Sequence, residues 1–215
     1  MFFVFLIIVV FLIAIDTSYD KTEELNKNIL KRFFGRQDIC RLRKNIYKSI
    51  MGGAEYMKSI KKYETIINEA LRSALEYDTP EGQINEFISF FGKHIGSDRI
   101  YIFEDDEEHH VTNNTYEWCA EGITPQIEHL QGVNMEVIDW WYDTFDEGKS
   151  VIISDVEELK GVHQVSYNML KYQNVCKVVV SPLRHKGQIK GFFGVDNPPA
   201  VDYNALTMFL DMIGT

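Results

Sequence analysis

The chain has 215 residues, of which 45% are hydrophobic and 25% are charged, a composition that excludes a disordered or fibrous protein. The formal net charge of −10 argues against nucleic acid as a partner of the whole chain. The three cysteines, Cys40, Cys119 and Cys176, form no spacing pattern, which excludes a paired disulfide scaffold and fits a reducing compartment.

The chain begins with an apolar segment. Residues 2–15 form an unbroken run of fourteen apolar residues, which as a helix covers about 21 Å against a bilayer hydrocarbon core of about 30 Å. A secretory signal would need a basic segment before the run and a small-residue cleavage site after it, and neither is visible. A buried core helix is the other alternative. We expect residues 1–15 to be a membrane anchor.

The segment after this run is strongly basic. Residues 21–62 carry twelve Lys and Arg residues against four Asp and Glu residues, a net charge of +8. Basic residues directly after an apolar span mark the cytoplasmic side of a membrane and attract anionic headgroups. The alternative is a solvated helix face without lipid contact. The sequence therefore predicts a location at the cell membrane, with residue 21 onward on the cytoplasmic side.

Residues 54–77 have helical periodicity, with a seam at alternating spacings of four and three: Tyr56, Ile60, Tyr63, Ile67, Ala70, Ala74 and Tyr77. The seam fits two interpretations, a parallel coiled coil that joins two subunits or a helix that packs on its own domain. We assign residues 16–77 to a basic juxtamembrane segment and helical linker, with a joint at Gly52 and Gly53. The coiled-coil interpretation predicts a homodimer.

A globular domain is expected over residues 78–215. Thr79 and Pro80 suit the start of a helix and Gly96 suits its C-cap, because Gly readily adopts the left-handed conformation. The other predicted elements, in chain order, are strands at 99–103 and 115–120, helices at 135–145, 155–159 and 164–172 around a short strand at 151–153, strands at 178–183 and 189–195, and a helix from about 202. That last helix reaches Thr215 without a cap, so we expect the protein to continue.

The order of these elements predicts the fold class. Both strong strand pairs are joined by short hairpin turns, which favours an antiparallel sheet flanked by helices over an alternating parallel fold. The sequence thus predicts an α+β domain.

The second hairpin resembles that of a GAF domain. The matching residues are 178–183, with Ser181-Pro182-Leu183 at the end, the turn at Lys186-Gly187, and residues 189–196. Residues 114–122 and 196–199 are similar to the GAF domains that precede GGDEF or EAL output domains in bacterial cyclic di-GMP signalling proteins. The resemblance covers about residues 77–215. It implies about six antiparallel strands with helices on both faces, and a sensory role without catalytic activity in this stretch.

The resemblance leads to a functional expectation. We expect a membrane-tethered cytoplasmic sensory domain that passes a signal to a C-terminal output domain, such as a diguanylate cyclase or another cyclic di-GMP enzyme. The alternative is a ligand-free dimerisation and scaffold module. No catalytic residues are predicted, because Asp155, His163 and Ser166 match a hydrolase triad only by type, without a nucleophile elbow. The resemblance identifies no cofactor, because GAF domains bind varied ligands and some bind none.

The candidate ligand-binding residues are Tyr101, Phe103, Trp118, Trp141 and His163. Tyr101 and Phe103 share a face because side chains two apart on a strand point the same way. Whether Trp118 shares that face depends on a hairpin register that the sequence leaves open, and the alternative is that these residues only pack the core. His109 and His110 lie among acidic residues, but adjacent residues on a wet hairpin tip rarely share one ligand geometry, so no metal site is predicted.

Overall fold

The computed structural model describes residues 36–199 and 203–214, and their side chains from residue 52 onward. The chain divides into two compact units, Met1–Glu55 and Tyr56–Thr215. The described part of the first unit is the beginning of helix α3 (Arg36–Ala74), which continues into the second. Among the described helices, none is long and apolar enough to cross a bilayer. The anchor predicted at residues 1–15 lies outside the described residues.

Helix α3 differs from the predicted linker in two ways. It passes without a break through Gly52 and Gly53, so the expected joint is absent, although each Gly costs about 1 kcal/mol in a helix relative to Ala. The second compact unit also begins at Tyr56 and so includes the C-terminal part of α3, rather than beginning at residue 78.

The predicted seam of α3 is buried in the domain to which the helix is joined. Tyr63, Ile67, Ala70 and Ala74 are buried and belong to one core with residues of the sheet and other helices. The structure therefore agrees with the second interpretation, a helix packed on its own domain. The homodimer stays a prediction.

Helix α4 (Pro80–Ile95) begins and ends where its sequence signals predict. The Thr79 hydroxyl oxygen accepts a hydrogen bond from the Gly82 N–H, which satisfies one of the unpaired donors of the first turn. Gly96 adopts the left-handed conformation with φ of 76°, and its N–H donates to the Gly92 carbonyl.

A six-stranded antiparallel sheet forms the centre of the domain, in the order β3-β2-β1-β6-β5-β4. Its strands are β1 (Arg99–Asp106), β2 (Val111–Cys119), β3 (Val133–Asn134), β4 (Val151–Ile153), β5 (Val178–His185) and β6 (Gln188–Asp196). The short β3 was not predicted, and the first hairpin is longer than predicted because Glu104, Asp105 and Asp106 continue β1 instead of forming the turn.

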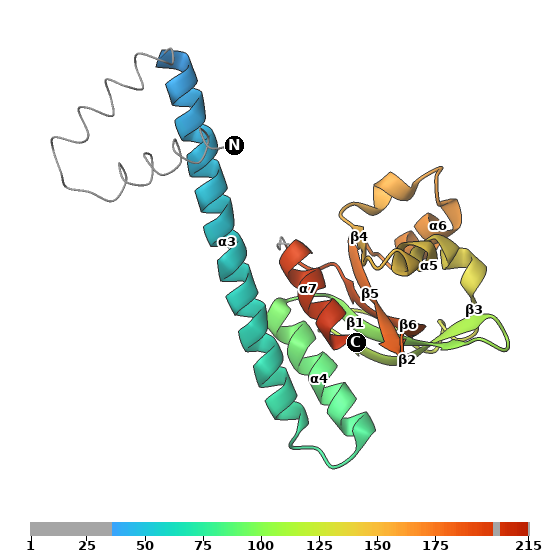
Figure 1. Cartoon of the computed structure of the whole chain (residues 1–215). Helices are drawn as coiled ribbons and strands as arrows, with labels where there is room; N and C mark the ends of the chain where they lie inside the picture. The colour runs from blue at the N-terminus through green and yellow to red at the C-terminus, as the bar shows by residue number, and fades with distance from the viewer. Residues whose placement is uncertain (1–35, 200–202, 215) are drawn as a thin grey trace. The chain divides into compact units, whose positions relative to one another are not determined.

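Helices cover both faces of this sheet (Figure 1). The remaining helical elements are η1 (Met135–Ile138), α5 (Asp139–Asp146), η2 (Val156–Leu159), α6 (Gln164–Tyr172) and α7 (Tyr203–Ile213). One core, here the first core, lies between the sheet and helices α3, α4 and α7. The second core lies between the opposite face and η1, α5, η2 and α6. The predicted GAF-like α+β fold is confirmed.

Helix α7 is tied to both α3 and the sheet. The rings of Phe209 on α7 and Tyr63 on α3 lie 6.1 Å apart, and the Gly214 carbonyl after α7 accepts a hydrogen bond of 2.6 Å from the Arg184 N–H on β5. The Ser150 hydroxyl before β4 donates to the Asp211 carboxylate on α7. These contacts join α7 to α3, to β5 and to the residue before β4.

Candidate functional site

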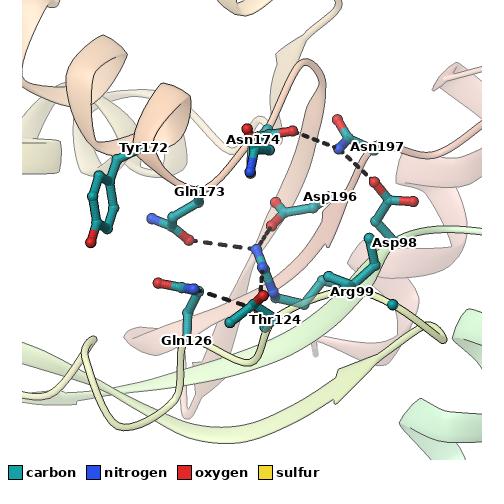
Figure 2. A pocket seen from close by; sticks show the side chains of 12 residues that line it. Asp98, Arg99, Thr124, Gln126, Tyr172, Gln173, Asn174, Asp196 and Asn197 are labelled. Atoms are coloured by element: carbon teal, nitrogen blue, oxygen red, sulfur yellow. Dashed lines mark hydrogen bonds and ion pairs between the residues drawn. The ribbon is translucent and has the colours of Figure 1, made fainter.

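A polar cavity of about 380 Å³ opens where β1 begins and β6 ends (Figure 2). Four chain segments contribute its wall: Asp98 and Arg99 at the start of β1, residues 122–124 and 126 after β2, residues 172–175 at the end of α6, and Asp196 and Asn197 at the end of β6. We call this space the outer cavity.

The sheet register brings the two central residues of the cavity together. Arg99, the first residue of β1, lies directly opposite Asp196, the last residue of β6, and opposite Cys119 at the end of β2. Antiparallel strands place the start of one strand beside the end of its neighbour. Arg99 and Asp196, almost a hundred positions apart in the sequence, therefore meet at one end of the two central strands.

The Arg99 guanidinium is buried and has its donors directed at several acceptors. Its Nη1 atom donates to Asp196 Oδ2 at 2.7 Å and its Nη2 atom donates to the Thr124 carbonyl at 3.0 Å. The Nε atom lies 3.4 Å from Glu117 Oε1, as an ion pair without hydrogen-bond geometry. Figure 2 shows Asp196, Thr124 and Gln173 arranged around the guanidinium. Little of Arg99 remains available to bind an anion.

Two buried carboxylates share this single guanidinium. The side chains of Asp196 and Glu117 are 3% and 2% exposed, and that of Arg99 is 3% exposed. The Glu117 carboxylate is further stabilised by the N–H groups of Gln126 and Ile127, which donate to its Oε2 atom. When all three groups are ionised, the cluster carries a net charge of −1.

The two ends of the ion pair respond differently to burial. Burial raises the pKa of Asp196 to about 6, and the opposing charge of Arg99 limits this rise. Burial also disfavours the Arg99 cation, but the charge of Asp196, the hydrogen bonding to Cys119 and Asp196 and the charge of Glu117 together outweigh burial and raise the pKa of Arg99 above its ordinary value. At neutral pH the pair is therefore ionised.

One oxygen of Asp196 has no hydrogen-bond partner. The Oδ1 atom is buried and receives no donor, although Asp196 lines the cavity. The Tyr101 hydroxyl is near enough that, after burial, the Asp196 charge raises the Tyr101 pKa, but no hydrogen bond of acceptable geometry joins them. A buried acceptor without a donor costs about 1–3 kcal/mol, which a bound water or ligand would recover.

A smaller pocket of about 30 Å³ adjoins the outer cavity and shares Arg99, Gln173 and Asp196 with it. Its other walls are aromatic or aliphatic and come from Tyr101, Phe103, Leu130, Trp141, Leu170 and Phe192. We call this space the inner pocket. It has room for one or two water molecules.

Three of the five predicted site residues line the inner pocket. Tyr101, Phe103 and Trp141 meet there, and the Trp141 ring lies 5.6 Å from the Phe192 ring. The buried Trp141 Nε1–H has no acceptor. These side chains also belong to the second core, so they pack the domain and line a pocket at once.

The other two predicted residues lie elsewhere, and Trp118 is on the wrong face for this site. Trp118 is the direct cross-strand partner of Ile100, so both side chains point into the first core. A Cβ on Gly92 would lie 2.3 Å from the Trp118 ring, which shows how closely the ring packs on α4. His163 stacks on Trp140 at 4.3 Å and lines neither space.

Sequence reasoning missed the charged residues of the site. Arg99 precedes an apolar strand, Asp196 ends another and Glu117 interrupts a third. A charged residue at the end of a buried strand is the signal that could have pointed to them, because such a residue needs a partner.

No protein-family model and no curated protein sequence matches this chain. Solved structures do match it. The phycocyanobilin-bound GAF domain from a cyanobacterial phytochrome is 16% identical, with 71% of this chain and 91% of that chain covered and a TM-score of 0.57. The GAF fold is therefore shown.

Two further neighbours have the same fold. The blue-light absorbing form of the Thermosynechococcus elongatus PixJ GAF domain is 18% identical over 66% of this chain and 83% of that chain, with a TM-score of 0.52. A free methionine-R-sulfoxide reductase from Neisseria meningitidis, in complex with its substrate, is 11% identical over 72% and 85%, with a TM-score of 0.54. Identities this low show a common fold and do not transfer a function.

Proposed function

We propose that residues 56–215 are a ligand-sensing regulatory domain, in which a small polar molecule binds the outer cavity and shifts helix α7. The observation that carries this proposal is the cavity itself, with the buried pair of Arg99 and Asp196 in its wall. Its volume lies in the range of small-molecule sites, about 300–1,000 Å³.

The position of the cavity supports a link to α7. Asp196 and Asn197 line the cavity, and the chain runs from them to the start of α7 at Tyr203. The Asn197 side chain bridges the wall, since its Oδ1 accepts from the N–H groups of Cys176 and Lys177 and its Nδ2 donates to Asp98. A ligand that moved this residue would therefore act on three walls of the cavity and on the connection to α7.

The geometry favours a ligand smaller than the phycocyanobilin of the phytochrome neighbour. Trp141, Phe145 and Phe192 are buried between the sheet and α5, and the inner pocket holds only one or two waters. The two cysteines with described side chains, Cys119 and Cys176, line neither space, and burial raises the pKa of the Cys119 thiol to about 11. A thiol adduct at this site is therefore not part of the proposal.

We further propose the setting of the domain in the cell. The apolar run at residues 2–15 and the net charge of +8 over residues 21–62 support tethering to a membrane, with the domain on the cytoplasmic side. The resemblance of residues 114–122 and 196–199 to GAF domains of cyclic di-GMP proteins supports an output domain of that class, such as a diguanylate cyclase.

A homodimer is also proposed, with the exposed side of α3 as its contact. Met57 and Leu71 on this helix are 62% and 50% exposed, Leu75 directly after it is 76% exposed, and Met208 and Met212 are exposed on α7. Apolar side chains gathered on exposed helices are common at subunit contacts. If no ligand binds, this surface favours the alternative function, a dimerisation and scaffold module.

Ligand screening of the full chain tests the proposal. Small polar metabolites that bind the outer cavity should raise the melting temperature. Gln173→Ala should abolish that rise, because Gln173 lines both spaces. Gln164→Ala is the matched control, since Gln164 is exposed at the start of α6 and should bind as wild type does. Equal binding by both variants, or no stabilising compound at all, would favour the scaffold function.

A further inference from the structure

The charges at the outer cavity are unbalanced towards the negative. Asp98, Arg99 and Asp196 are the charged residues among those that line it, and Glu117 lies directly behind Arg99. With these groups ionised, three carboxylates and one guanidinium give a net charge of −2. A site built for a carboxylate or phosphate would show the opposite excess.

The hydrogen bonds of the cluster lead to the same conclusion. The donors of Arg99 point at Asp196, Thr124 and Gln173, which leaves the guanidinium occupied. Asp196 Oδ1 is a buried acceptor without a donor, and its residue is 2% exposed and lines both spaces. A positively charged donor would satisfy this oxygen and balance the charge, while the buried Trp141 Nε1–H, a donor without an acceptor, is available to an oxygen of the same ligand.

The inner pocket places aromatic side chains beside this carboxylate. Tyr101, Phe103, Trp141 and Phe192 line it together with Asp196. Aromatic faces attract ammonium groups through the negative potential of their rings, most strongly where water is excluded. A strongly hydrated inorganic cation gains less from such walls than an organic ammonium group does.

We propose that the ligand of this domain is a small organic ammonium compound, with its cationic head between Asp196 and the aromatic walls of the inner pocket and its polar remainder in the outer cavity. Gln126 and Gln173 are suited to hold hydroxyl or amide groups of that remainder. This inference rests on the proposed sensory function and specifies the chemical class of its ligand.

Binding of two simple amines to the full chain tests the inference. The probes are ethanolamine and ethylamine, whose primary ammonium heads carry N–H donors and match the small inner pocket, each against a neutral analogue: ethylene glycol for ethanolamine and ethanol for ethylamine. Glycolate serves as the anion and potassium chloride as the control for ionic strength. The readout is the set of indole N–H signals in an NMR spectrum, because Trp141 lines the inner pocket while Trp118 packs on the opposite sheet face.

The expected result is a saturable shift of the Trp141 signal with an amine, an unchanged Trp118 signal, and binding at least about tenfold weaker for the neutral analogue. Asp196→Asn should weaken amine binding by a similar factor. Asp146→Asn, the same change at an exposed residue at the end of α5, should not. The comparison of amine with neutral analogue uses the wild-type chain and does not depend on the variant folding.

Three outcomes would overturn the inference. Equal binding of the neutral analogues or of glycolate would show that charge does not select the ligand and would leave the proposed sensory function standing. An equal shift with potassium chloride would show a simple ion effect. If neither the amines nor any compound of the metabolite screen bound, the inference and the proposed function would fail together.

Discussion

Replacing Arg99 by an uncharged side chain should destabilise the domain far more than removing the charge of Asp196. Both Asp196 and Glu117 have a carboxylate oxygen within 3.4 Å of the guanidinium, where two unit charges attract by roughly 5 kcal/mol at an effective dielectric constant of about 20. Arg99→Met leaves both carboxylates buried without a counter-charge. We expect it to lower the free energy of unfolding by about 3–5 kcal/mol, the usual result of stranding a buried charge.

Asp196→Asn has the opposite electrostatic effect, because it brings the net charge of the cluster from −1 to zero. The Asn carbonyl still accepts the hydrogen bond from Arg99 Nη1. We therefore expect the free energy of unfolding at pH 7 to equal or exceed that of the wild type. Urea titration of the full chain, followed by circular dichroism, measures both variants. Arg72→Met, on the exposed surface of α3, is the control for loss of an arginine and should change the value by no more than about 0.5 kcal/mol. An Asp196→Asn variant as unstable as Arg99→Met would refute the reasoning.

Three further predictions concern pH and packing. The pKa of Asp196 is raised from 3.8 to about 6 in the folded chain. The contribution of Asp196 to the free energy of unfolding therefore falls as the pH rises between these values. The gain in the free energy of unfolding from Asp196→Asn should accordingly be larger at pH 7 than at about pH 4. Gly92→Ala should cost about 1–3 kcal/mol, because the new Cβ would meet the Trp118 ring. Gly53→Ala, where the new Cβ would lie in open space on α3, should instead raise the free energy of unfolding by up to about 1 kcal/mol. A higher urea midpoint for Gly92→Ala than for Gly53→Ala would contradict the packing of Trp118 on α4. Trp141→Ala should cost about 3–5 kcal/mol because Trp141 is 3% exposed in the second core, and calorimetry showing a loss below 1 kcal/mol would make Trp141 a pocket wall without a packing role.

Elements with local signals were predictable from the sequence. Thr79 and Gly96 mark the ends of α4 through capping that involves only neighbouring residues. The second hairpin follows from two apolar runs around the Lys186-Gly187 turn, both of whose residues have positive φ. Helix α6 begins and ends at the predicted residues.

The site was only partly predictable, because it depends on pairings across the sheet. The sheet face on which Trp118 lies follows from its cross-strand partner Ile100. The register of β1 with β2 shifts between Ile102 and Phe103, and no local sequence pattern reveals this shift. The meeting of Arg99 with Asp196 likewise requires β1 and β6 to be neighbours. Alternation along one strand predicted that Tyr101 and Phe103 share a face, and this was correct because it needs no partner strand.

The central claim is that a ligand in the outer cavity acts on α7, and hydrogen–deuterium exchange of the full chain tests it most directly. The strongest binder from the screen should slow exchange of backbone amides at residues 122–124, 126 and 172–175, which line the cavity, and should also change exchange along α7. The matched variants Gln173→Ala and Gln164→Ala show whether both changes depend on the cavity. Protection at the cavity with α7 unchanged, or protection only at residues away from the cavity, would contradict the account.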